Sequence, residues 1–254
     1  MLMAFAHSTR WILVCLLLTA CGQSGPPQPP APVPEAETET ETEVWPQGGQ
    51  LARLDAARSS LRIRVFSAGR AAALGHNHVL TAPWLQGALW TPLEGLEGAR
   101  FSLSLRLDEL EIDRPQERAA LGPAFATPLD AQAIAGTREH MLGPDNLDAA
   151  RHPWVRMHSI GIQGTPPELR VDVDIELHGR HQRRVLPLRA WREAGAWRTQ
   201  GTFTVLQSDF GVTPYSVLGG LLAVQDALQI DFDLSLGSAD PPAHQVLVEQ
   251  AAVR

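Results

Sequence analysis

The sequence predicts an all-β fold with one helical insert, arranged as an antiparallel barrel of about eight strands. Long stretches alternate apolar and polar residues with a period of two, the pattern of a strand with one buried and one solvated face. Glycine-containing turns separate neighbouring stretches. A single alanine-rich segment, residues 115–142, lacks this alternation and predicts the insert.

Eight stretches are predicted as strands. The alternation is strong over residues 61–65, 101–107, 169–177 and 228–236, and weaker over 86–90, 155–162, 185–190 and 197–206. Turns at 179–181 and 193–195 make the second half a series of hairpins. The apolar faces are consistent with the inside of a closed barrel. Barrels of this size are either packed solid or hold one small ligand, and the pattern does not choose between these interiors.

Within the insert, residues 128–141 suit a helix because they are rich in good helix formers. Asp145 follows this helix and is a candidate cap for a short turn through Ala150. The insert therefore interrupts the series of strands at one point only.

Composition excludes several classes of protein. The chain has 254 residues and two cysteines, Cys15 and Cys21, so the body contains neither a disulfide framework nor a cysteine-rich zinc module. All 21 basic residues are arginine, and the formal net charge of −7 argues against a nucleic-acid partner. No run of about eighteen apolar residues is present, so no transmembrane helix is expected.

The N-terminus is typical of a bacterial lipoprotein signal peptide, which we assign to residues 1–20. Arg10 precedes a short apolar run, residues 11–20, and the run ends in Leu-Thr-Ala-Cys at 18–21. This ending resembles a lipobox, which makes Cys21 the predicted site of lipid attachment. Gly22 stands where an aspartate would resemble an inner-membrane retention signal, so we expect an outer-membrane location facing the periplasm.

The remaining chain divides into three parts. Residues 21–50 begin with the lipidated cysteine and continue as a Pro/Glu/Thr-rich tether, with little to bury and an expected disordered, extended conformation. Residues 51–237 form the barrel domain, and residues 238–254 form a C-terminal tail. The sequence leaves open whether the protein is a monomer or a homodimer.

Among the histidines, His76 and His78 have the sequence spacing that is most typical of a metal site. On a strand, two residues separated by one position point to the same side and could present two imidazoles to one metal. A third ligand would come from His140, His152 or His158. The alternative is a polar contact at the mouth of the barrel, where the pair would bind a head group or the backbone. We favour the alternative and predict no metal centre, because two imidazoles do not make a site.

Enzyme motifs are absent from the sequence. It contains no Gly-x-Ser-x-Gly, no phosphate-binding glycine loop and no His-Glu-x-x-His. We therefore expect a protein that is not an enzyme and uses no cofactor. The tryptophans of the body are more typical of a barrel wall or rim than of a cofactor site.

Four segments together resemble the YceI-like family of periplasmic, lipocalin-like proteins. They comprise residues 61–69 leading to Gly-His-Asn-His at 75–78, residues 138–159, residues 171–188, and residues 201–212 closed by 227–236. The resemblance extends over about residues 51–237, and the order and spacing of the segments carry it more than any single motif. It implies an eight-stranded antiparallel lipocalin-like barrel crossed by a helix, with a long apolar cavity for an isoprenoid or fatty-chain amphiphile.

The resulting hypothesis is a non-catalytic, lipid-anchored protein that sequesters or transports a long-chain amphiphile in the bacterial cell envelope. The alternative hypothesis is a metal-binding envelope protein that uses the His-x-His pair. We expect the ligand to contact eight residues, namely His76, His78, Phe101, Leu103, Trp154, Phe203, Phe210 and Phe232.

Overall fold

The computed structural model describes residues 44–238. The predicted signal peptide, Cys21, most of the predicted tether and residues 239–254 lie outside the described residues. The first strand begins at Gln50 and the last ends at Ser238, so the strands extend over the predicted barrel domain. No helix in the described part is long and apolar enough to cross a membrane.

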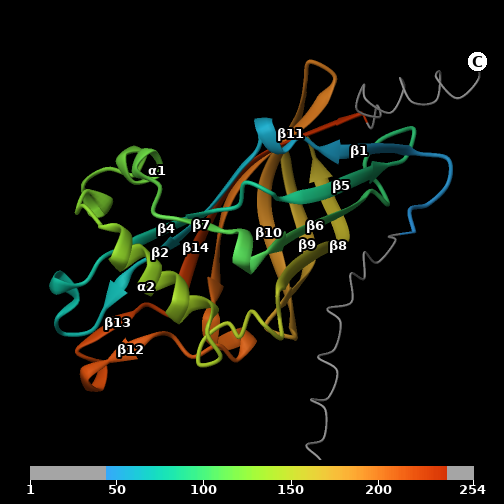
Figure 1. The fold of residues 1–254 in the computed structure, drawn as a ribbon. Coiled ribbons are helices and arrows are strands. Elements are labelled where there is room, and N and C mark those ends of the chain that lie inside the picture. The colour runs from blue at the N-terminus through green and yellow to red at the C-terminus, as the bar shows by residue number, and fades with distance from the viewer. Residues whose placement is uncertain (1–43, 239–254) are drawn as a thin grey trace, which may run out of the picture. The chain divides into compact units, whose positions relative to one another are not determined.

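Within residues 44–238, eight antiparallel strands close into a barrel (Figure 1). Around the ring they are β1 (Gln50–Leu54), β5 (Gln86–Thr91), β6 (Arg100–Arg106), β8 (Trp154–Thr165), β9 (Glu168–Leu177), β10 (Arg180–Glu193), β11 (Ala196–Leu206) and β14 (Ala227–Ser238). Pairing of Leu54 with Leu236 joins β1 to β14 and closes the ring. The predicted fold class is therefore confirmed.

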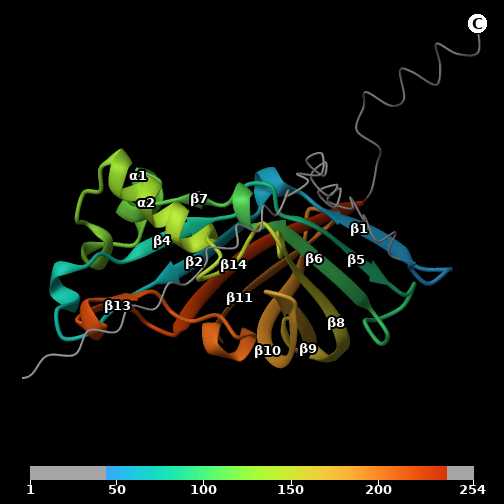
Figure 2. The ribbon, with the colours of Figure 1, turned by 60° about the horizontal axis from the view of Figure 1, so that its bottom comes forward.

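One edge of β14 carries two neighbours in succession. Residues 236–238 pair with β1, whereas residues 229–233 pair with β2 (Ser60–Val65). The sheet continues from β2 to β4 (His78–Thr81) and β7 (Glu111–Ile112). These three strands extend the sheet beyond the ring (Figure 2). The sequence predicted the strand at 61–65 but missed β1, whose residues do not alternate.

Two hairpin turns match the predicted glycine positions to within one residue. His178 and Gly179 connect β9 to β10, and Ala194 and Gly195 connect β10 to β11. All four residues have positive φ, as a two-residue turn between twisted strands of this type requires. The first turn lies one position before the predicted 179–181, because Arg180 already pairs with Leu177.

The helical insert contains α1 (Pro115–Ala120), a short 3₁₀ helix (Pro123–Phe125) and α2 (Ala131–Leu142). The side chain of Asp130 accepts a hydrogen bond from the backbone N–H of Ala133 at 2.7 Å and caps α2. The helix therefore begins three residues after the predicted position. Residues 144–147 and 149–151 form turns, as predicted for this segment, and no helix follows Asp145 there.

A small sheet lies at the extended end of the molecule, near α2 (Figures 1 and 2). It consists of β3 (Ser67–Ala68), β12 (Ser216–Val217) and β13 (Leu222–Val224), with β13 in the middle. Short 3₁₀ helices complete the fold, at Ala56–Arg58, Ala72–Leu74, Leu107–Glu109, Gln207–Phe210 and Leu218–Gly220. None of these small elements was predicted, because segments of two to four residues show no measurable periodicity.

Candidate ligand-binding cavity

An apolar cavity of about 490 Å³ occupies the barrel interior at the end covered by α2. Strands β2, β6, β8, β9, β11 and β14 contribute side chains from their inward faces, among them Ile63, Leu103, Met157, Ile175, Phe203 and Ile230. Helix α2 contributes Ala133, Gly136, Thr137, His140 and Met141, which lie on one face because their spacing follows the helical period. No side chain of Asp, Glu, Lys or Arg among the described residues lines this cavity.

A second, smaller volume of about 110 Å³ continues the barrel interior. Four residues, Leu61, Leu103, Met157 and Phe203, line both volumes and therefore form the boundary between them. The smaller volume is lined further by Phe101, Val173, Trp197 and Phe232. The two volumes together give the interior an elongated apolar space.

Polar side chains line the larger cavity on the side of β4 and α2. His78 is the first residue of β4 and His76 precedes it, His140 comes from α2, and Tyr215 comes from the segment before β12. The rings of His140 and Tyr215 contact each other, with centroids 4.9 Å apart. Asn146 also lines the cavity and donates a hydrogen bond to the carbonyl of Thr213 at 2.9 Å, which ties the turn after α2 to the segment before β12. This side of the cavity can contact a polar head group.

The ring of His78 is held by a buried ionic network. Its Nδ1 lies 2.6 Å from Oδ2 of Asp113, whose side chain is 0% exposed. The other oxygen, Oδ1 of Asp113, accepts hydrogen bonds from Arg118 at 2.6 Å and from the backbone N–H of Val79 at 3.0 Å. Arg118, whose side chain is 8% exposed, also donates to the carbonyls of Asn77 and Thr127.

The carboxylate form of Asp113 is stabilised by its partners. Burial by itself raises the pKa of Asp113, but the hydrogen bonds from His78, the Val79 backbone and Arg118 outweigh burial, so the net pKa lies below the ordinary value. Asp113 also has φ of 55°, an uncommon backbone conformation for a residue other than glycine. Sequence reasoning missed both Asp113 and Arg118, because neither belongs to a motif and both meet His78 only in the folded chain.

The structure brings six of the eight predicted ligand contacts to the cavities. His76 and His78 line the larger volume, Phe101 and Phe232 line the smaller one, and Leu103 and Phe203 line both. The rings of Phe203 and Phe232 meet edge to face, with centroids 6.2 Å apart. The period-two pattern was the signal that placed these four apolar side chains inside the barrel.

The other two predicted contacts, Trp154 and Phe210, line neither cavity. In β8, Val155 and Met157 face the interior, so Trp154 lies on the opposite face, where the guanidinium groups of Arg106 and Arg156 contact its ring. Phe210 lies in a 3₁₀ helix and is 1% exposed within the core.

Two of the three predicted third ligands of a metal, His152 and His158, do not line the cavity of the His-x-His pair, whereas His140 lines it and contacts Tyr215. His152 contacts His178, and His158 lies 3.9 Å from Asp174 on the outer face of the sheet. His181 also binds Asp174, at 2.7 Å, and this hydrogen bond raises the pKa of His181. Within residues 44–238, no group of three or more His, Cys, Asp or Glu residues is placed to hold a metal ion.

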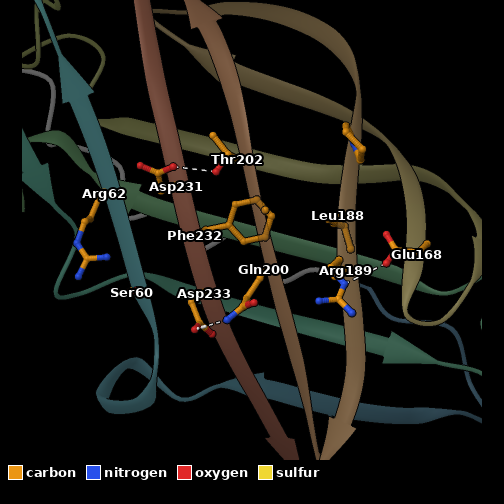
Figure 3. Close-up of a pocket in the computed structure, with 12 residues that line it drawn as sticks. Ser60, Arg62, Glu168, Leu188, Arg189, Gln200, Thr202, Asp231, Phe232 and Asp233 are labelled. Atoms are coloured by element: carbon orange, nitrogen blue, oxygen red, sulfur yellow. Dashed lines mark hydrogen bonds and ion pairs between the residues drawn. The ribbon is translucent and has the colours of Figure 1, made fainter. Parts of the chain in front are cut away.

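A groove of about 450 Å³ lies on the outer wall of the barrel (Figure 3). Its polar residues bind one another: Asp231 accepts from Thr202 at 2.8 Å, Asp233 from Gln200 at 2.8 Å, and Glu168 from Arg189 at 3.0 Å. These pairs leave the groove without a concentrated charge or a set of unpaired donors. The interior cavity is the stronger candidate for a functional site.

Comparison with known proteins agrees with this geometry. The YceI-like domain family matches residues 97–236. Among solved structures, the chain is similar to BcnA of Burkholderia cenocepacia, with 14% identity, a TM-score of 0.54, and coverage of 72% of this chain and 98% of that one. It is also similar to a Campylobacter jejuni YCEI protein, with 10% identity, a TM-score of 0.39, and coverage of 54% and 70%. No curated protein matches the sequence.

A closed eight-stranded antiparallel barrel with an apolar interior defines the lipocalin-like class of folds. Within this class, the chain belongs to the YceI-like family, because the family match covers more than half of its residues. This family is a family of binding proteins for hydrophobic ligands. The resemblance identified in the sequence is therefore confirmed.

Proposed function

We propose that this protein binds a long-chain amphiphile, an isoprenoid or a fatty-chain lipid, and sequesters or transports it in the bacterial cell envelope without catalysis. The observation that carries the proposal is the apolar cavity of about 490 Å³ with its narrower continuation of about 110 Å³. Among residues 44–238, the larger volume has no charged side chain in its lining, and the smaller one has only Arg198 among its otherwise mainly apolar lining residues, so the elongated space suits an alkyl or prenyl chain. Polar groups at the side of β4 and α2 suit a small head group.

The hydrophobic effect supplies enough free energy for such binding. Transfer of a methylene group from water to an apolar site is worth about 0.8 kcal/mol, so a chain of about ten methylenes gains about 8 kcal/mol before the cost of ordering it. Micromolar affinity corresponds to about 8 kcal/mol. Longer chains or several favourable contacts would offset the entropy cost, so no covalent attachment is required.

Native mass spectrometry tests the proposal directly. Protein purified from its own host should carry a non-covalent lipid of several hundred daltons, on the order expected for a ligand that fills a pocket of this kind. Leu103→Trp fills the junction of the two volumes and should release this lipid. Trp154→Ala, which alters the outer wall, is the control and should retain it. Parent protein that carries no lipid and binds no alkyl probe would overturn the proposal.

The envelope location is supported by the sequence, through the signal peptide at residues 1–20 and the lipobox that ends in Cys21. Cys21→Ala should abolish incorporation of labelled fatty acid and release the protein from the membrane fraction. Gly22→Asp should keep the lipid but shift the protein from the outer to the inner membrane on a density gradient. Equal labelling of Cys21→Ala and parent would contradict the anchor.

A further inference from the structure

The contacts of Asp113 determine which nitrogen of His78 carries the proton. Oδ2 of Asp113 lies 2.6 Å from Nδ1, while Arg118 and the Val79 backbone N–H occupy Oδ1. Arg118 forms an ion pair with the carboxylate of Asp113 and balances its charge. Asp113 therefore remains a hydrogen-bond acceptor without a positive charge on His78. Nδ1 of His78 must therefore be the donor, and a neutral ring then has a lone pair on Nε2.

Nε2 of His78 is open to the cavity. No group in residues 44–238 hydrogen-bonds to this nitrogen. It is also not one of the fully buried side-chain atoms that lack a partner, so it retains accessible surface. His78 lines the larger cavity, and its side chain is 16% exposed. In an imidazole ring the two nitrogens point in divergent directions, so with Nδ1 turned towards Asp113, Nε2 faces away from the buried network.

We propose that Nε2 of His78 accepts a hydrogen bond from the head group of the bound amphiphile, and that it selects an uncharged head with a hydroxyl donor, as in a long-chain alcohol. This inference rests on the proposed function and specifies the head-group chemistry. Asp113 acts as a positioning residue, because it fixes the ring and its tautomer without contacting the ligand.

The cavity lining favours an uncharged head over a charged one. The larger cavity contains no Asp, Glu, Lys or Arg side chain that could pair with a charged head group. An isolated charge loses its hydration when it enters such a site. A hydroxyl group loses less, and it recovers the loss when it donates to Nε2.

Matched ligands test the choice of head group. Dodecan-1-ol, its methyl ether 1-methoxydodecane, and dodecanoate share one chain and can compete at pH 8 with N-phenyl-1-naphthylamine, a neutral fluorescent probe. The alcohol should bind about five- to tenfold more tightly than the ether, as expected for one hydrogen bond. Equal affinities of alcohol and ether, or tighter binding of dodecanoate, would overturn the proposal. Failure of all three to bind would instead contradict the proposed function itself.

Asp113→Asn should reverse the tautomer of His78. The amide oxygen can still accept from Arg118 and Val79, while its NH₂ group donates to Nδ1 and leaves the proton on Nε2. Nε2 then donates, so the preference for the alcohol over the ether should disappear or invert. Asp174→Asn makes the same change in the His181–Asp174 pair outside the cavity and should retain the preference. An Asp113→Asn variant that folds and keeps the preference would overturn the proposal.

Nuclear magnetic resonance provides a readout that does not depend on a variant. In the unaltered full chain labelled with ¹⁵N, long-range proton–nitrogen correlations should show His78 protonated at Nδ1 and unprotonated at Nε2. Addition of dodecan-1-ol should shift the Nε2 resonance, and addition of 1-methoxydodecane should shift it less. A proton on Nε2 in the free protein would exclude the acceptor role.

Discussion

The carboxylate of Asp113 accepts a hydrogen bond from Nδ1 of His78 at 2.6 Å, although 35 positions separate the two residues in the chain. This contact ties the start of β4 to the end of β7, whose pairing extends the sheet beyond the barrel ring. It also turns one histidine of the cavity lining into an oriented polar group. The network therefore supports both the fold and the site.

The first prediction concerns acid stability. Because the pKa of folded Asp113 lies below its ordinary value, its stabilising effect is fully present above the unfolded pKa of about 3.9 and is lost as the pH falls through the lower folded value. The free energy of unfolding, measured with urea, should therefore decrease between about pH 5 and pH 2. Asp113→Asn should be less stable at neutral pH and should show a shallower decrease. Parallel pH profiles of parent and variant would contradict this account.

The second prediction concerns the boundary between the two cavities. Phe203→Ala removes a ring that lines both volumes, so it should join them and increase the affinity for longer alkyl chains relative to shorter ones. The free energy of unfolding should drop by about 3 kcal/mol. Phe66→Ala is the matched control, because Phe66 packs edge to face on Phe125 and lines neither volume. It should lower stability without changing the preference for chain length.

The third prediction compares two hairpin glycines with positive φ. At Gly195 an added Cβ meets no atom within 4 Å, so Gly195→Ala should cost only the backbone strain, about 1 kcal/mol. At Gly179 an added Cβ would lie 2.9 Å from Cε1 of His152, so Gly179→Ala should cost more, about 2–3 kcal/mol. Urea denaturation of both variants measures the difference. Equal losses would show that the His152 ring moves away without cost.

The fourth prediction compares two valines on adjacent strands. Val173 of β9 is 0% exposed, and Val173→Ala should lower the free energy of unfolding by about 2 kcal/mol through lost burial and a new void. Val185 of β10 is 52% exposed, and Val185→Ala should change it by less than about 0.5 kcal/mol. Thermal unfolding followed by circular dichroism provides the comparison. A larger loss at Val185 would contradict the assignment of the faces.

Much of the architecture followed from local pattern. Each predicted strand lies within or beside a strand of the structure, and α2 lies within the predicted insert. The same pattern placed Phe101, Leu103, Phe203 and Phe232 inside the barrel. Applied strictly it would also have placed Trp154 outside, because Val155 and Met157 take the inward positions of β8. The short strands β1, β4 and β7 were beyond its reach, since they are too brief or too irregular to alternate.

The sequence by itself determined the class of fold and the strand faces, because alternation acts between residues close in the chain, and its short linear motif predicts the Cys21 anchor. Only the tertiary structure decided that the barrel interior contains a cavity, that Trp154 lies outside it, and that Asp113 and Arg118 hold His78. Cavity volume depends on how side chains from many strands and α2 pack together. The network depends on pairing β2 with β4 and β4 with β7, which no local pattern encodes.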